Sequence, residues 1–153
     1  MVGRREFGLT GIAAAAALAM KATAVADDKT GSAGHAGHGG MFSKCAEACS
    51  NCQRECDACA HHCAVQLAEG HKAHLMTLQT CLDCAALCAT AAQIVSREGI
   101  FSNLACTACA DACARCGKEC DKHQGDKMMA ACAEECRRCE KACRDMVAMA
   151  KFE

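Results

Sequence analysis

The sequence predicts an all-α protein, an antiparallel up-down-up-down four-helix bundle with a cysteine-lined core. Of its 153 residues, 18 are Cys and none is Pro. The cysteines fall into four runs, and within each run every step is three or four residues. Steps that average about 3.5 residues place side chains in one stripe along a helix, where a bundle helix normally carries Leu and Ile. Four helices with one buried stripe each and short connections pack as such a bundle.

The four cysteine runs define the four expected helices, at residues 42–68, 72–97, 102–123 and 126–151. The runs are Cys45, Cys49, Cys52, Cys56, Cys59 and Cys63; Cys81, Cys84 and Cys88; Cys106, Cys109, Cys113, Cys116 and Cys120; and Cys132, Cys136, Cys139 and Cys143. The residues between them are mostly good helix formers. The expected helix-ending glycines are Gly70, Gly99 and Gly125, and the expected N-caps are Ser43, Ser102 and Asp126.

Residues 1–26 resemble a twin-arginine signal peptide, which directs the export of folded proteins. Arg4 and Arg5 precede an uncharged run, and Ala24-Val25-Ala26 forms a cleavage site before Asp27. The apolar run has about a dozen residues, fewer than the roughly 20 that cross a bilayer. We therefore expect export to the periplasm or the extracellular space, and a mature form without a membrane segment.

Residues 27–40 are rich in Gly and small polar residues and predict a flexible tether before the Cys-rich bundle of residues 41–153. Within the tether, His35 and His38 either bind a metal ion transiently or are solvated linker residues. The second interpretation has the entropy of a Gly-rich chain in its favour.

The composition argues against nucleic-acid binding and against catalysis. A net charge of -1, four Phe and the absence of Trp and Tyr leave no basic surface for phosphates and few rings for bases. The chain shows no Ser/His/Asp arrangement and no glycine-rich phosphate loop. Its Cys pairs repeat along helices and do not mark one reactive thiol at a helix N-terminus. We therefore expect a binding protein rather than an enzyme.

A core of thiols requires a reason other than packing, because Leu would bury more apolar area at each position. Disulfides between residues three or four apart on one helix have poor geometry, although pairs across helices remain possible. Iron–sulfur clusters need a turning backbone around the cluster, which a continuous helix does not provide. Metal ions bound by thiolates are therefore the stronger interpretation.

Charge distinguishes the candidate metals. About four zinc ions in four-thiolate sites would neutralise only part of the charge of 18 thiolates, and burying the remainder is costly. Cu(I) prefers thiolates and accepts two or three of them. With bridging thiolates, one Cu(I) per sulfur makes the core neutral, so the capacity lies between about nine and about 18 ions. Because binding displaces thiol protons, affinity rises with pH.

The leader, the Gly/His tether and the four Cys-striped helices resemble the bacterial copper storage proteins, a family of Cys-rich four-helix bundles. The resemblance covers residues 27–153. It implies a homotetramer of bundles, each filled with Cu(I) on Cys thiolates, with His and Met at one open end admitting the metal. A copper donor or acceptor protein is a further partner that we expect for a copper-binding protein. The family has exported and cytosolic branches, and the leader indicates the exported one.

The two ends of the predicted bundle differ in composition. One end collects His61, His62, His71, His74, Met76, His123, Met128 and Met129. The other collects Met41, Phe42, Ile94, Val95, Ile100, Phe101, Leu104, Met146, Val147 and Met149, and is expected to form an apolar plug. His123, Met129 and His74 continue the Cys stripes and are our predicted uptake ligands. The alternative for each is ordinary: a solvated His or a Met that fills the core. His61 is expected at the surface, and Met146 in the core.

The helix expected at 72–97 is apolar on nearly all sides, since Asp83 is its only charged residue between Ala73 and Ser96. A bundle helix of this kind is normally covered by another surface. We therefore expect this helix in the interface of a homo-oligomer.

Two other functions remain open besides Cu(I) storage or sequestration: a zinc or other soft-metal buffer, and a thiol redox reservoir.

Overall fold

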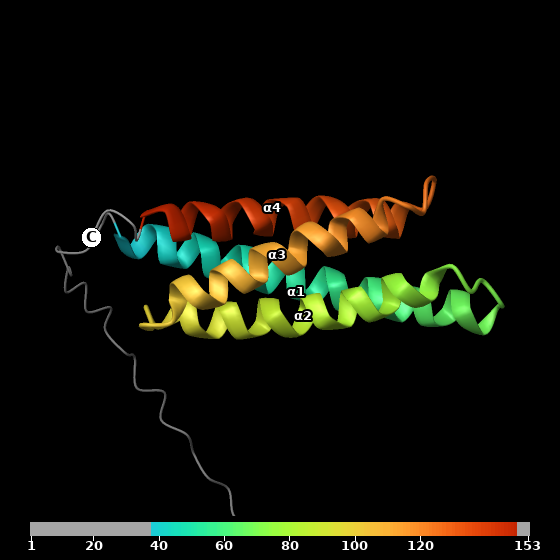
Figure 1. Ribbon diagram of the computed structural model, residues 1–153, viewed down its shortest axis with the longest axis horizontal. Coiled ribbons are helices and arrows are strands. Elements are labelled where there is room, and N and C mark those ends of the chain that lie inside the picture. Colours follow the sequence, from blue (N-terminus) through green and yellow to red (C-terminus); the bar gives the residue numbers. More distant parts are fainter. Residues whose placement is uncertain (1–37, 150–153) are drawn as a thin grey trace, which may run out of the picture. The chain divides into compact units, whose positions relative to one another are not determined.

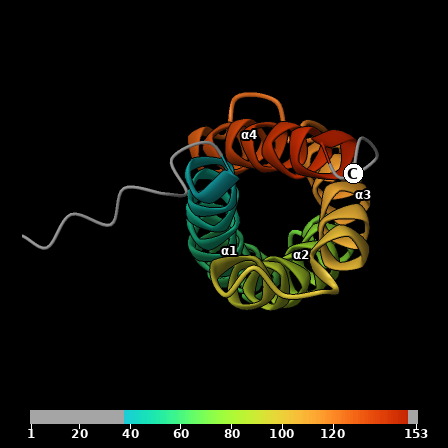
Figure 2. The same cartoon turned by 90° about the vertical axis from the view of Figure 1, so that its left-hand side faces the viewer.

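A computed structural model describes residues 38–149 of the chain, and these residues form four α-helices. The helices are α1 (His38–Ala68), α2 (His74–Ser96), α3 (Ser102–Cys120) and α4 (Lys127–Met149). They run alternately up and down (Figure 1), which confirms the predicted antiparallel topology. Viewed end on, they lie around a ring in chain order, each beside its predecessor, with α4 beside α1 (Figure 2). The predicted signal peptide and most of the predicted tether, with His35, lie outside the described residues.

The helix ends follow the predicted signals in two of three connections. Gly70 and Gly125 have φ of 95° and 85°, the left-handed region that glycine adopts without strain; Gly70 lies two residues after the end of α1, and Gly125 two residues before the start of α4. Asp126 caps α4, because its Oδ1 accepts hydrogen bonds from the backbone N–H groups of Met128 (2.9 Å) and Met129 (3.2 Å). The third predicted glycine, Gly99, lies in the α2–α3 turn without a positive φ.

The predicted bounds differ most from the structure at the start of the first helix and at the end of the third, and two of the three predicted N-caps are wrong. Ser102 is the first residue of α3, and its Oγ donates to the backbone oxygen of Gly99 (2.6 Å) and does not cap the helix. The first helix begins at His38 rather than at 42, so the last three residues of the predicted tether are helical. Met41 and Phe42 are partly buried against the core and hold this first turn in place. Ser43 therefore lies inside α1 and does not cap it. The third helix was expected to reach residue 123, but α3 ends at Cys120, and His123 lies in the turn that follows.

The core consists almost entirely of cysteine and alanine. All 18 cysteines are buried, with at most 1% of any of them exposed, and the remaining buried apolar residues are Ala, Val95, Met129 and Met146. Among the described helices, α2 alone is long and apolar enough to cross a membrane, and 39% of its apolar window is buried inside the bundle. The core helix of a bundle can be equally long and apolar, and the cysteine stripe of α2 packs against the other three helices.

The predicted apolar plug is only partly correct. Val95 and Met146 are buried, and Met41, Phe42 and Val147 pack against the core. However, Ile100, Phe101 and Leu104 are 91%, 61% and 69% exposed. These three residues lie in the α2–α3 turn and the first turn of α3, and their side chains are exposed to solvent. They therefore form an apolar surface rather than a seal.

Candidate metal centre

The 18 cysteine sulfurs form one continuous column along the bundle axis, and we call this column the thiol core. Every helix contributes to it, because the three-and-four spacing keeps each Cys on the inward face. Sulfurs of different helices lie 3.5–4.0 Å apart along its length, both across the bundle between α1 and α3 and between adjacent helices. All 18 thiols are free. The sequence therefore predicted the composition and the continuity of this core.

The middle of the thiol core is built from layers of four sulfurs, one from each helix. In one such layer the Sγ of Cys52 lies 3.7 Å from that of Cys113 and 3.8 Å from that of Cys136, and Cys84 lies 3.7 Å from Cys113. The adjacent layers contain Cys49, Cys88, Cys109 and Cys139 on one side, and Cys56, Cys81, Cys116 and Cys132 on the other. Layers also contact each other, as between Cys52 and Cys56 at 3.9 Å.

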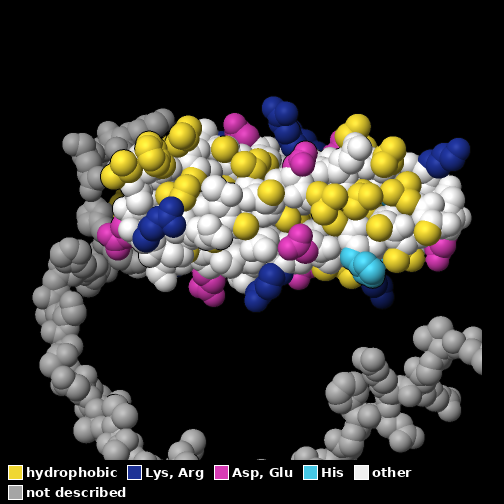
Figure 3. Space-filling model, turned by 90° about the horizontal axis from the view of Figure 1, so that it is seen from below, with side chains coloured by type: hydrophobic (Ala, Val, Ile, Leu, Met, Phe, Trp, Pro, Cys, Tyr) yellow, Lys and Arg dark blue, Asp and Glu magenta, His cyan; other side chains and the backbone are white. Residues whose placement is uncertain are grey.

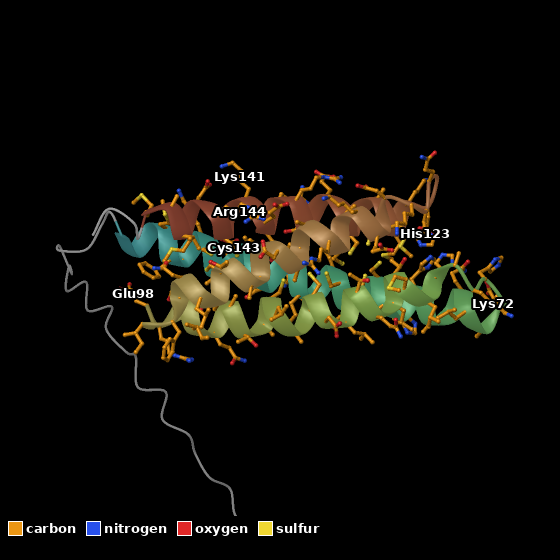
Figure 4. All side chains as sticks on the ribbon, viewed as in Figure 1. Lys72, Glu98, His123, Lys141, Cys143 and Arg144 are labelled. Atoms are coloured by element: carbon orange, nitrogen blue, oxygen red, sulfur yellow. The ribbon has the colours of Figure 1, made fainter. Side chains whose placement is uncertain are left out.

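At each end of the thiol core, one helix no longer contributes a cysteine. At the end near Cys143 (Figure 4), Cys45 lies 3.7 Å from Cys106 and 3.9 Å from Cys143. On α2 the buried residues beyond Cys88 are Ala91, Ala92 and Val95. This end is therefore a three-helix, three-sulfur layer closed on the α2 side by apolar groups.

At the other end, Met129 replaces cysteine as the sulfur of α4. The thiol of Cys59 lies 3.4 Å from Met129 Sδ and 4.0 Å from Cys120 Sγ, and Met129 is fully buried. A thioether is a soft ligand like a thiolate but carries no charge. Met129, a predicted uptake ligand, therefore lies in contact with the thiol core.

Beyond Met129 the bundle ends in a mouth of histidines, which we define as His62, His71, His74 and His123 with Asp126. The rings of His74 and His123, the other two predicted ligands, stack with centroids 4.2 Å apart and planes inclined by 25°. His62 and His71 each approach His74 edge-on at 6.2 Å. Figure 4 shows His123 at this end of the bundle, above the α1–α2 connection that contains Lys72. The predicted surface residue His61 is exposed.

Two contacts at the mouth were not predicted. His62 Nε2 lies 2.8 Å from Asp126 Oδ2, which links α1 to the start of α4. Thr77, only 1% exposed, places its Oγ1 2.8 Å from His123 Nε2. Thr77 follows His74 by three residues and precedes Cys81 by four, so the cysteine spacing itself places it on the inward stripe of α2. Its hydroxyl is not a soft-metal ligand, and a search for Cys, His and Met therefore overlooks it.

The sulfur spacing matches a three-coordinate soft ion. Cys88, Cys109 and Cys113 form a triangle with sides of 3.5, 3.6 and 4.0 Å. An ion at the centre of such a triangle would lie about 2.0–2.3 Å from each sulfur, close to the roughly 2.3 Å of a zinc–thiolate bond. Four-sulfur groups within 4.8 Å also occur, but they overlap: Cys52 belongs to a group with Cys84 and Cys113 and to another with Cys56 and Cys84.

Neighbouring thiols share their protons unequally. The pKa of Cys56 is raised chiefly because its thiol donates a hydrogen bond to Cys116, and also because it is buried. The pKa of Cys120 is lowered to about 5, chiefly because the thiol of Cys116 donates to it, against the opposing effect of burial. The core therefore contains both retained protons and sulfurs prepared to ionise. Metal binding must displace the retained protons.

The metal-free bundle should lose stability in alkaline solution. Burial raises the pKa of Cys63 from 9.0 to about 11, against a hydrogen bond with Cys59 that lowers it. A group whose pKa is raised by folding favours the folded state below its unfolded pKa, and this contribution is lost as pH rises from about 9 through 11. We expect the urea midpoint of reduced, metal-free protein to fall between pH 8 and 10.5, and to fall less in Cys63→Ala. An unchanged or higher midpoint at pH 10.5 would contradict this assignment.

Asp126→Ala should destabilise the bundle by about 1 kcal/mol or more, because it removes the cap of α4 and leaves His62 without its partner. Burial raises the pKa of Asp126, but the hydrogen bonds from His62 and from the Met129 and Met128 amides lower it further, so its net pKa lies below 3.8. The difference from wild type should therefore be present above about pH 4 and disappear in more acidic solution.

Asp121→Ala is the matched control, because Asp121 pairs with Arg137 on the surface at 3.1 Å, and exposed pairs contribute little. Chemical denaturation of both variants at pH 7 and pH 3 would measure the comparison. Equal stabilities of the two variants at pH 7 would show that Asp126 does not hold the mouth end together.

Two sequence comparisons relate this chain to known proteins. The sequence model of the copper storage protein family matches residues 39–148. An uncharacterised cysteine-rich protein of Bacillus subtilis, YhjQ, is 36% identical over 86 residues, which are 56% of this chain and 78% of that protein.

Two solved structures share the fold. A copper storage protein from Streptomyces lividans loaded with 10 copper equivalents is 34% identical, with a TM-score of 0.65 over 78% of this chain and 93% of that one. The apo form of copper storage protein 3 from Bacillus subtilis is 32% identical, with a TM-score of 0.59 over 69% of this chain and 97% of that one. The family match spans all but the first and last residues of the described bundle and includes every cysteine of the thiol core. The chain therefore belongs to the copper storage protein family.

Proposed function

We propose that this protein stores or sequesters many Cu(I) ions on the thiolates of its core, for supply to copper enzymes or for detoxification. The observation that supports this most directly is the continuity of the thiol core. A sulfur that lies within 4.0 Å of neighbours on two other helices is placed to bridge ions, and Cys56, 3.9 Å from both Cys116 and Cys132, is such a sulfur. Bridging lets the number of monovalent ions approach the number of thiolates, and the buried charge then approaches zero.

A zinc buffer fits this geometry less well. An isolated, closed zinc site built from cysteine alone takes four thiolates of its own. The four-sulfur groups share members, since Cys132 belongs to one group with Cys56 and Cys116 and to another with Cys59 and Cys81. A zinc ion in one group therefore uses thiolates that the next group would need for its own ion. Ions that accept bridging ligands do not meet this conflict.

Titration of the reduced protein with Cu(I) and with Zn(II), each against a competing chelator, tests the proposal. We expect more than about nine Cu(I) ions and no more than about four Zn(II) ions per chain. Saturation with one to four Cu(I) ions would contradict storage. Tight binding of neither metal, with rapid formation of disulfides in oxidant, would favour the thiol redox reservoir.

His74, His123 and Met129 are proposed as the ligands through which Cu(I) reaches the thiol core. Their support is position: the two rings stack at the mouth, and Met129 contacts Cys59 at the first sulfur layer. Burial of the His123 ring and the neighbouring His74 lower the pKa of His123, which keeps its imidazole neutral and able to bind a metal at pH 7. A copper donor or acceptor protein would meet the bundle at this end.

The site of storage is proposed to be outside the cytoplasm, on the basis of the twin-arginine motif at Arg4 and Arg5. The N-terminus of the exported protein should be Asp27. Replacing both arginines by lysine should retain the protein in the cytoplasm. An exported protein in that variant would contradict the twin-arginine assignment.

We propose a homotetramer in which α2 contributes the interface between bundles. The surface that contains α2 carries apolar side chains along its length (Figure 3). Leu75, Leu82 and Leu87 of α2 are 52%, 50% and 37% exposed. Exposed apolar side chains arranged along one helix are typical of an interaction surface. Phe101 and Leu104, which are also exposed, line one pocket with Leu87 and so continue this surface onto the start of α3.

Leu82→Glu should therefore lower the mass of the protein in solution, because it places a charge in the proposed interface. Ala130→Glu adds the same charge at an exposed position of α4 and is the matched control. Sedimentation analysis of both variants would measure the change. An unchanged mass for Leu82→Glu, or equal losses in the two variants, would rule out an α2 interface.

A further inference from the structure

Thr77 is the one buried polar residue of α2 between His74 and Cys88 that is neither Cys nor His, and it lies on the inward stripe of the helix. The buried residues of that stripe follow the spacing His74, Thr77, Cys81, Cys84 and Cys88. A hydroxyl is a poor ligand for a soft ion, so Thr77 interrupts the column of ligands at the level where copper would leave the mouth and meet the first sulfurs. Its presence at this position requires a different account.

The hydroxyl of Thr77 is buried, and a buried hydroxyl normally has a hydrogen-bond partner. That partner is the imidazole of His123, whose Nε2 lies 2.8 Å from Thr77 Oγ1. His123 lies in the turn after α3 and is not held by helical backbone. Its ring is fixed instead by the stack on His74, at 4.2 Å, and by Thr77. The hydrogen bond with Thr77 therefore occupies Nε2 of His123, and Nδ1 is the ring nitrogen that remains for a metal ion.

His74 shows the same arrangement with the nitrogens exchanged. Its Nδ1 lies 3.2 Å from the backbone oxygen of His71. A carbonyl oxygen only accepts hydrogen bonds, so Nδ1 of the neutral ring carries the proton and Nε2 has the free lone pair. Histidines that bind metals generally donate their second N–H to an oxygen in this way, which fixes both the tautomer and the ring orientation.

We propose that Thr77 is a positioning residue for copper uptake: His123 Nε2–H donates to Thr77 Oγ1, and the lone pair of His123 Nδ1 is thereby held open for incoming Cu(I). This inference rests on the proposed storage function and names a residue that acts through His123 without binding the ion. The two stacked rings then offer one free nitrogen each, Nε2 of His74 and Nδ1 of His123. Thr77 contributes to the rate of uptake and not to the capacity of the core.

Thr77→Val tests the proposal, because valine keeps the shape of threonine and removes the oxygen. In the metal-free protein, the ¹⁵N shifts of the His123 ring should show the proton on Nε2 in wild type and a mixture of tautomers in Thr77→Val. Uptake of Cu(I) from a weak complex should slow by about tenfold or more in this variant. The number of ions bound at saturation should not change. Thr77→Ser, which retains the hydroxyl, should restore both the tautomer and the rate.

A double-mutant cycle with His123→Ala separates a positioning role from a general effect on packing. If Thr77 acts through His123, adding Thr77→Val to His123→Ala should slow uptake no further. An additional loss of rate in the double variant would overturn the proposal, as would wild-type uptake by Thr77→Val or a wild-type His123 ring protonated on Nδ1. Failure of the storage function would be distinguishable, because wild type would then bind few ions whatever the tautomer of His123.

Discussion

Filling the core with Cu(I) is expected to raise the thermal unfolding midpoint of the described bundle by at least about 20 °C. The buried residues of the metal-free core are mostly Cys and Ala, with Val95, Met129 and Met146, so large aliphatic side chains contribute little. An ion that binds only the folded chain adds about 4 kcal/mol at a thousandfold excess over its Kd. Two such sites add about 8 kcal/mol, and a domain of this size gains about 3–5 °C per kcal/mol.

Circular dichroism of reduced protein, with and without Cu(I) in the absence of oxygen, would measure this shift. Protein that is loaded and then stripped by a chelator is the control, and it should return to the metal-free midpoint. A rise of less than about 5 °C at saturation would mean that the ions do not bind the thiol core of the folded bundle.

Cys113→Ser should lower the Cu(I) capacity by two or more ions, whereas Cys63→Ser should lower it by at most one. Cys113 lies in the middle of the core, 3.6 Å from Cys88 and 3.7 Å from both Cys52 and Cys84. A thiolate with neighbours on several sides bridges more than one ion, so each ion that it serves is weakened. Cys63 is the last cysteine of α1, at the mouth end of the thiol core.

Serine has nearly the shape of cysteine in both variants, so packing changes little, and the two substitutions differ mainly in place. Metal analysis and native mass spectrometry at saturation would give both capacities. Equal losses of one ion would indicate isolated sites that do not share sulfurs. Loss of helicity in Cys113→Ser would be detected by circular dichroism, and Cys84→Ser in the same layer would then give the comparison.

The periodicity of cysteine predicted the fold and the thiol core because one residue type carried both signals. A three-and-four spacing places each Cys inward whatever the exact helix ends, and so errors at His38 and Cys120 did not move a single sulfur out of the core. The capping role of Asp126 was also readable, since a carboxylate before a helix accepts its first amides.

Features set by contacts between distant segments could not be predicted. The start of α1 depends on the packing of Met41 and Phe42, which overrides the poor helix propensity of the glycines before them. The outward direction of Ile100 depends on the path of a turn, and composition alone favoured a plug. The hydrogen bond between Thr77 and His123 joins a hydroxyl and an imidazole that lie 46 positions apart in the sequence. No periodic pattern marks a pair of this kind.

Anomalous X-ray diffraction at the copper edge from crystals of the Cu(I)-loaded protein tests the central claim most directly. The account predicts a row of copper ions along the bundle axis from the layer of Cys45 to that of Cys59, with sulfurs of the middle layers bound to more than one ion. Copper confined to the histidine mouth or to the outer surface would contradict it, and so would separate ions that share no sulfur.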